Sequence, residues 1–142
     1  MSRHTARIHA FNLIFQFPFY SDWSLSRLEE YLESVKDLEE HLQTVINAKD
    51  KSFISDEVTG VFTKLQELDD IISKYLKDWD LERIAKVDLA LLRLALYEIN
   101  YVSDISIATA INEVVEIAKV YGTDESPAFI NGLLGQAVRE NA

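Results

Sequence analysis

The chain has 142 residues, a formal net charge of -10 and no cysteine. This length suits one domain, and the lack of cysteine excludes disulfides, thiolate zinc sites and cysteine nucleophiles, so we expect a cytoplasmic protein. Residues 1–20 carry Arg3 and Arg7 and no acid, which leaves 12 of the 14 basic side chains to face 24 acidic ones, or -12, in the remainder. Such an acidic body repels nucleic acid, so contact with a polyanion must be local or helped by a basic partner.

The first half of the chain carries the apolar spacing of amphipathic helices. We predict a helix over Thr5–Phe17, which ends before Pro18 because proline donates no backbone hydrogen bond. Apolar residues spaced by three and four predict a second helix from Leu25 to about Ala48, with an acidic solvated face, and a third over Phe53–Trp79. The segment NAKDKS, residues 47–52, is the expected break between them.

The segment from Trp79 to Val102 is the most apolar of the chain. Its second part holds the polar residues Asp88, Arg93, Glu98 and Asn100, which do not share one face at 100° per residue. We therefore expect a central helix covered by neighbours on most sides, too polar and too short to span a membrane. Burial of a charge is costly, so Arg93 should meet a carboxylate inside the bundle. Asp88 either faces outward near the helix start or is presented to a basic partner.

Two further helices complete the chain. The spacing of apolar residues predicts a helix over Ile107–Tyr121, with Gly122 as its cap. Ser126 followed by Pro127 predicts the start of a last helix, in which serine accepts amide hydrogen bonds and proline fits the first turn. No segment has the alternation that a sheet requires, so the predicted fold is all-α.

Enzyme chemistry finds little support in the sequence. The histidines, His4, His9 and His41, do not form an HExxH pair or lie beside a GxSxG turn, and no phosphate-binding glycine motif occurs. Acidic side chains on amphipathic helices are more often surface charge than paired catalytic carboxylates. We therefore expect a protein that is not an enzyme and has no cofactor or metal.

Two places combine features that suit nucleic acid. At the N-terminus, basic and imidazole side chains alternate with rings that could stack on bases: Arg3, His4, Arg7, His9, Phe11 and Phe15. A frayed end with solvated arginines before a core-facing aromatic row explains this pattern equally well. Tyr121 and Phe129 flank the turn GTDES, where the amides of the last helix could receive an anion. Core packing is the commoner role for such rings.

Several segments, in this order, resemble the bacterial NusB transcription antitermination factors. They are RHTARIHAFNLIFQ (3–16), LERIAKVDLALLRLALYEI (81–99), DIS (104–106), AINEVVEIAKVYGTDES (110–126) and FINGLLGQAVRE (129–140). The resemblance implies an all-helical fold of two small bundles packed around a central helix, in one domain over 1–142. The implied sub-bundles comprise about 1–78 and about 79–142.

The resemblance also implies a function. Members of this family are not enzymes; they pair with NusE, a ribosomal protein, and bind the boxA RNA of nascent ribosomal RNA transcripts, so that RNA polymerase reads through terminators. By motif position, the implied RNA-binding residues are Arg3, His4, Arg7, Tyr121, Glu125 and Phe129. The implied NusE-binding residues are Phe15, Glu82 and Asp88.

The sequence departs from the family at two basic positions. His4 stands where a second arginine is common, and Ala128 replaces a lysine or similar polar residue. Fewer phosphate contacts imply weaker RNA binding and a shallower salt dependence. The alternative hypothesis is a helical interaction protein of the same fold that acts through protein contact or self-association, including a homodimer, without binding RNA.

Overall fold

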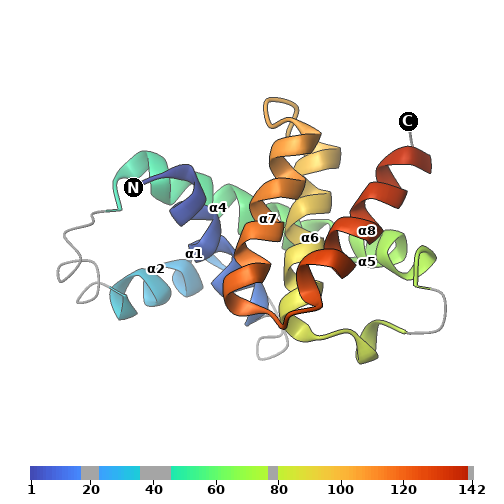
Figure 1. Ribbon diagram of the computed structural model, residues 1–142. Helices are drawn as coiled ribbons and strands as arrows, with labels where there is room; N and C mark the ends of the chain where they lie inside the picture. The colour runs from blue at the N-terminus through green and yellow to red at the C-terminus, as the bar shows by residue number, and fades with distance from the viewer. Residues whose placement is uncertain (17–22, 36–45, 77–79, 141–142) are drawn as a thin grey trace. The chain divides into compact units, whose positions relative to one another are not determined.

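The computed structural model describes residues 1–16, 23–35, 46–76 and 80–140. These residues form helices and connecting segments without a strand, which confirms the predicted all-helical fold (Figure 1). The chain divides into two compact units, Met1–Phe62 and Thr63–Ala142. Helix α5 (Leu65–Lys74) belongs to the second unit because it contacts α6 (Lys86–Tyr101), so this boundary lies earlier in the chain than residue 78.

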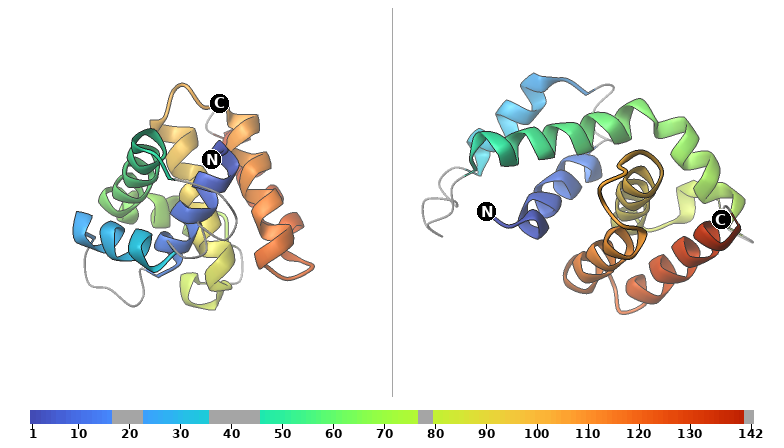
Figure 2. Two further views of the ribbon diagram at one scale, coloured as in Figure 1. Left: turned by 90° about the vertical axis from the view of Figure 1, so that its left-hand side faces the viewer. Right: turned by 90° about the horizontal axis from the view of Figure 1, so that it is seen from above.

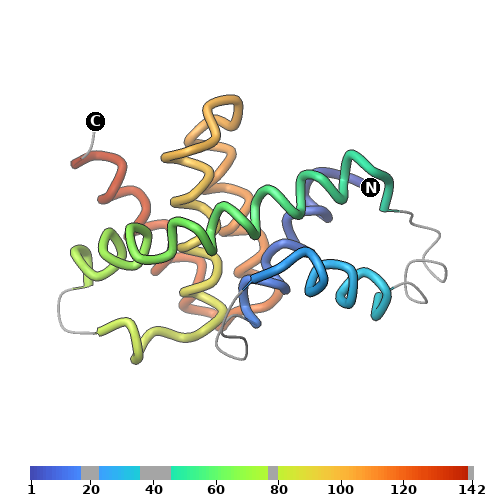
Figure 3. The backbone as a smooth tube through the Cα atoms, turned by 180° about the vertical axis from the view of Figure 1, so that it is seen from behind, coloured from blue at the N-terminus to red at the C-terminus, as the bar shows by residue number. Residues whose placement is uncertain are grey.

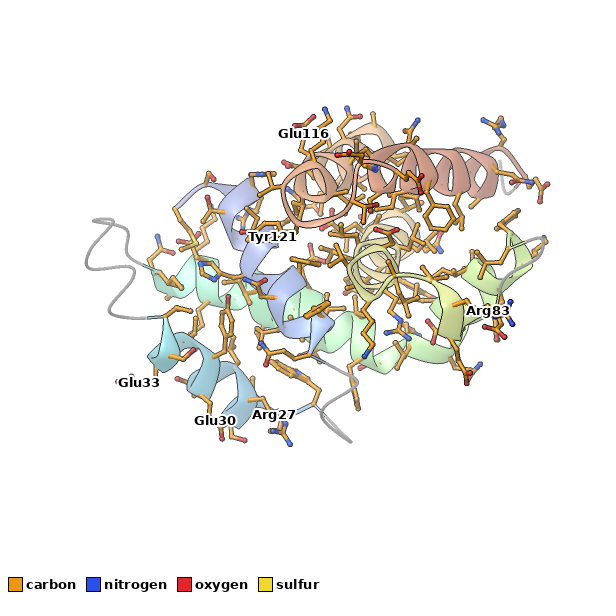
Figure 4. All side chains as sticks on the ribbon, turned by 60° about the horizontal axis from the view of Figure 1, so that its bottom comes forward. Arg27, Glu30, Glu33, Arg83, Glu116 and Tyr121 are labelled. Atoms are coloured by element: carbon orange, nitrogen blue, oxygen red, sulfur yellow. The ribbon has the colours of Figure 1, made fainter. Side chains whose placement is uncertain are left out.

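Three helices form the described part of the first unit: α1 (Arg3–Phe15), α2 (Leu25–Ser34) and α4 (Ala48–Thr63) (Figure 2). Their buried apolar side chains are Ala6, Ala10, Phe11, Leu13, Ile14, Leu28, Ile54, Val58 and Val61. The acidic face predicted for α2 is present where it is described, because Glu30 and Glu33 are exposed and point away from α1 (Figure 4).

A polar cluster joins α1 to α2. The Nδ1 atom of His9 lies 2.7 Å from the Tyr31 hydroxyl, and the side-chain amide of Asn12 donates to the same hydroxyl at 3.1 Å. The two rings also meet edge to face, with centroids 5.6 Å apart. Burial lowers the pKa of His9 below its ordinary value of 6.5, since the charged imidazolium is poorly solvated there.

This lowered pKa predicts an acid-sensitive first unit. Below pH 6.5, His9 becomes protonated in the unfolded chain before it does so in the folded chain, because its folded pKa is lower. The free energy of unfolding therefore falls as the pH drops from 6.5 towards the pKa of His9 in the folded chain. Thermal unfolding of the wild type and of His9→Asn, measured between pH 7.5 and 5.5, tests this. The variant should lose less stability on acidification; equal losses would exclude His9 as the cause.

The predicted break at residues 47–52 is wrong, because α4 begins at Ala48. The Asn47 side chain accepts the Asp50 amide at 2.8 Å, and Asp50 accepts the Asn47 amide at 3.5 Å. This reciprocal capping starts a helix where the polar residues suggested a loop.

The predicted helix from Leu25 ends at Ser34 instead of continuing towards Ala48. Pro18, Trp79 and residues 36–45 lie outside the described residues.

The second unit is organised around the central helix. α6 contacts α5, α7 (Ile107–Tyr121) and α8 (Ser126–Glu140), and α7 contacts α8. Figures 1 and 3, seen from opposite sides, show α7 and α8 on one side of α6 and α5 on the other. The buried residues of α6 surround its axis: Asp88, Ala90, Leu91, Leu92, Leu94, Ala95, Leu96 and Glu98. The predicted cover on most sides is confirmed, although the α-helix starts at Lys86, after the 3₁₀ turn η2 (Leu81–Arg83).

The predicted carboxylate partner of Arg93 is Asp69 on α5. Arg93 donates from Nε to one Asp69 carboxylate oxygen at 2.8 Å and from Nη2 to the other at 2.9 Å. Both side chains are largely buried, with exposed fractions of 12% and 17%. This bidentate ion pair holds α5 against α6. It also gives the largely buried Arg93 guanidinium of α6 the carboxylate partner that its charge requires.

The described parts of the chain contain neither a membrane-spanning helix nor a cluster of metal-binding side chains. None of the helices described there is both long enough and apolar enough to cross a membrane. Within the same residues, no three His, Asp or Glu side chains gather as a metal ion would require.

Candidate nucleic-acid interface

The turn between α7 and α8 is fixed by internal hydrogen bonds. The Gly122 amide donates to the Ala118 carbonyl at 2.9 Å, which ends α7 at the predicted cap. The Ser126 hydroxyl accepts from the Thr123 amide at 3.0 Å, and the Ser126 amide donates to the Thr123 carbonyl at 3.1 Å. Ser126 is buried and bonds back into the turn, so its predicted role as the acceptor of the next helical amides is wrong.

Gly122 is required by space in this turn. Its backbone is extended, with φ -95° and ψ -165°, so conformational freedom is not the reason for glycine. A Cβ atom at residue 122 would lie 2.5 Å from the Ser126 hydroxyl oxygen and 2.9 Å from the Ala118 carbonyl oxygen. The close approach of the two helix ends therefore leaves no room for a side chain.

Two exposed rings flank the fixed turn. Tyr121, the last residue of α7, is 46% exposed, and Phe129 in the first turn of α8 is 37% exposed (Tyr121 is labelled in Figure 4). Core packing, the commoner role for such rings, is therefore not what the structure shows. A large exposed aromatic side chain offers a face on which a nucleobase can stack.

The same turn is acidic. Asp124 and Glu125 are both exposed, and no basic residue occurs between Tyr121 and Phe129. The Glu125 carbonyl oxygen accepts a hydrogen bond from the Phe129 amide at 3.1 Å, so Glu125 lies immediately before the first residue of α8. A carboxylate here repels phosphate but accepts hydrogen bonds from the amino groups of bases. The turn is thus suited to the base side of a nucleic acid, and phosphate binding must come from elsewhere.

The N-terminus is helical from Arg3 onward, so the frayed end of the alternative interpretation is wrong, although its solvated Arg3 and its core-facing Phe11 are present. Ser2 caps α1 by accepting the Thr5 amide at 3.1 Å. The guanidinium carbon atoms of Arg3 and Arg7 lie 4.2 and 5.5 Å from the centroid of the Phe53 ring on α4. Arg3 is exposed, whereas Arg7 is only 3% exposed.

The other predicted N-terminal contacts differ in burial. His4 is partly exposed. Phe11 is 2% exposed, so it is a core residue and the idea that it stacks on bases is wrong. Arg3, His4 and Arg7 belong to the first unit, and Tyr121, Glu125 and Phe129 belong to the second.

The residues predicted to face a partner also differ in exposure. Phe15 is partly exposed and contacts Phe11, with ring centroids 6.1 Å apart. Glu82 is exposed in η2, but Asp88 is 7% exposed rather than facing outward. Among the described residues, one carboxylate oxygen of Asp88 has no hydrogen-bond partner. A buried acceptor without a hydrogen bond costs stability, so Asp88 is not explained by the packing of the described residues.

Phe53 is the functional candidate that sequence reasoning missed. It looked like one apolar residue of an amphipathic helix, and nothing local connects it with residues at the N-terminus. The signal was weak but present, since Arg3 and Arg7 are four residues apart and share a helix face that one ring can cover.

Known proteins resemble the chain over nearly its full length. The sequence profile of the NusB family matches residues 4–139. The transcription antitermination protein NusB of Acetivibrio thermocellus is 42% identical over 139 residues, covering 98% of this chain and 90% of that protein. Its counterpart in Carboxydothermus hydrogenoformans is 44% identical over 136 residues, covering 95% and 91%.

Solved structures agree with this relationship. NusB of T. maritima matches with a TM-score of 0.81 and 36% identity, covering 99% of this chain and 92% of that one. A chain from the crystal structure of antitermination factors NusB and NusE in complex with dsRNA has a TM-score of 0.81 at 20% identity, which shows the fold alone. Such relatives are transcription factors rather than enzymes, as was predicted for this chain. By profile, sequence and fold, the chain belongs to the NusB family.

Proposed function

We propose that this protein is a transcription antitermination factor that pairs with the ribosomal protein NusE and binds the boxA RNA of nascent ribosomal RNA transcripts. In this role it helps RNA polymerase read through terminators in the cytoplasm. Family membership supports the proposal, since relatives named as antitermination proteins cover nearly the whole chain. The observation that carries it is the pair of exposed rings, Tyr121 and Phe129, on a turn fixed by hydrogen bonds.

Different side chains would contact the bases and the phosphates of a single RNA strand. Tyr121 and Phe129 stack on bases, and Glu125 accepts hydrogen bonds from base amino groups. Arg3 and His4 supply phosphate contacts, and Arg7 supports the same face from a buried position.

An acidic protein needs help to hold RNA. With a formal charge of -10, the protein repels the phosphate backbone beyond the immediate contacts. A basic ribosomal protein that docks on Phe15, Glu82 and Asp88 would neutralise part of this charge and complete the RNA surface.

The central test is a titration of labelled boxA RNA with this protein, with NusE and with their mixture at several salt concentrations. The mixture should bind more tightly than either protein alone, and affinity should fall with salt. No gain from mixing would contradict the proposal.

Removing one ring tests the stacking role directly. Tyr121→Ala should weaken RNA binding by the mixture roughly tenfold, because a base–aromatic stack contributes about 1–3 kcal/mol. Phe129→Ala should act similarly. Tyr101→Ala is the matched control: this ring is 43% exposed at the end of α6, its hydroxyl donates to Glu67, and it takes no part in the proposed surface. Equal losses from Tyr121→Ala and Tyr101→Ala would contradict a specific stacking site.

The exposed apolar side chains favour one alternative function. Val120 is 74% exposed beside Tyr121, so this end of α7 could mediate self-association or another protein contact without RNA. Sedimentation measurements separate the two possibilities. If Tyr121→Ala abolishes a homodimer while RNA binding is absent from the wild type, the protein-contact hypothesis is favoured.

A further inference from the structure

One aromatic ring joins the basic N-terminus to α4. Phe53, in the second turn of α4, is partly exposed, and its ring centroid lies 4.2 Å from the Arg3 guanidinium carbon and 5.5 Å from that of Arg7. Distances within about 6 Å allow attraction between a cation and the ring quadrupole. The first two turns of α1 and the second turn of α4 are therefore joined through two cations that share one ring.

The two arginines are not equivalent in this arrangement. Arg7 is 3% exposed, so its guanidinium is held inside the first unit. Arg3 is exposed although it is closer to the ring. The ring therefore holds one guanidinium at the surface, and Arg7 contributes to the support beneath it.

We infer that Phe53 is a positioning residue for RNA binding, because it holds the Arg3 guanidinium in place for a phosphate; this inference rests on the proposed function. Arginine has a long side chain that loses conformational freedom when it binds, and stacking removes part of that freedom in advance. A guanidinium stacked on a ring still donates hydrogen bonds from its edge, so contact with the ring and contact with phosphate do not compete.

A role as ordinary core packing explains Phe53 less well. The buried apolar residues of α4 are Ile54, Val58 and Val61, and Phe53 is not among them. Its partial exposure and its two cationic neighbours suit a support at the edge of the unit. The inference also explains how an N-terminus with only two arginines could bind RNA. A guanidinium that is already held in place binds a phosphate more tightly than a mobile one.

The test compares Phe53→Leu, which keeps an apolar side chain but removes the aromatic face, with Phe53→Tyr, which keeps the face. RNA affinity of the mixture with NusE should fall about two- to fivefold for Phe53→Leu and stay close to wild type for Phe53→Tyr. Arg3→Ala should weaken binding in the wild type, and it should cost markedly less in the Phe53→Leu background. Full additivity of Phe53→Leu with Arg3→Ala would overturn the inference.

Two further measurements separate positioning from folding and from the proposed function. Phe53→Leu combined with Tyr121→Ala should be additive, since Phe53 acts through Arg3, and Arg3 and Tyr121 contact different parts of the RNA; a general loss of folding would appear in both cycles. In the free protein, NMR should show a ring-current shift of the Arg3 side-chain protons that disappears in Phe53→Leu. Absence of that shift in the wild type overturns the inference without reference to RNA. A normal shift with no RNA binding by the wild-type mixture overturns the proposed function, and with it the purpose assigned to Phe53.

Discussion

Replacement of Arg93 by alanine should lower the free energy of unfolding by about 3 kcal/mol, because the change leaves the Asp69 carboxylate buried and unpaired. The wild-type pair is bidentate, at 2.8 and 2.9 Å, and its side chains are only 12% and 17% exposed. The change also removes the packing of a long side chain between α5 and α6. Chemical denaturation of the wild type and of Arg93→Ala measures the loss.

A double replacement distinguishes the charge from the packing. Arg93→Met with Asp69→Leu puts apolar side chains in place of both ions, and such exchanges are often neutral or stabilising. We therefore expect the double variant to unfold with a free energy much closer to wild type than Arg93→Ala. If Arg93→Ala loses less than about 0.5 kcal/mol, a value typical of surface substitutions, the pair does not hold α5 against α6.

Replacement of Gly122 by alanine should destabilise the second unit by about 2–3 kcal/mol, at the upper end of the usual cost of overpacking. The added methyl group would lie 2.5 Å from the Ser126 hydroxyl oxygen and 2.9 Å from a backbone carbonyl oxygen that cannot turn aside. Relief requires the ends of α7 and α8 to separate, which breaks the hydrogen bond from Thr123 to Ser126. RNA binding should therefore fall as well, because Tyr121 and Phe129 lose their fixed spacing.

Gly132 provides the matched control for this prediction. It lies within α8 and is exposed, and a Cβ atom added there would have no heavy atom within 4 Å apart from its chain neighbours and the backbone of its own helix. Gly132→Ala should raise the free energy of unfolding by up to about 1 kcal/mol, since alanine is the better helix former. Thermal unfolding of the two variants should shift in opposite directions. Destabilisation by both would show that α8 tolerates no alanine, rather than that the turn lacks space.

The fold was predictable where apolar spacing and charge burial act together. The bounds of α7 match the predicted helix over Ile107–Tyr121, and the partner expected for Arg93 is present as Asp69. The failures lie at helix ends. Residues 47–52 are polar enough to suggest a loop, yet Asn47 and Asp50 cap each other and begin α4. Propensity gave the wrong answer there because side-chain capping compensates for the polar composition.

The side chains proposed to contact RNA could be predicted from the sequence, but the residue that holds Arg3 in place could not. The rings Tyr121 and Phe129 and the cation Arg3 were first singled out by residue pattern, and the family resemblance then assigned them a role; the structure shows all three exposed. Phe53 was missed because its meaning depends on a tertiary contact with the two arginines. The burial of Arg7 was missed for the same reason, since no local pattern distinguishes a solvated arginine from one packed on a ring.

The hydrogen-bonded turn between Gly122 and Ser126 has a kinetic consequence. Since its backbone is organised before any ligand arrives, association with RNA need not wait for a loop to order, and the encounter rate should depend mainly on ionic strength. Discrimination among related transcripts should then appear in how long each complex lasts. A poorly matched strand would be captured almost as fast as a good one and released much sooner.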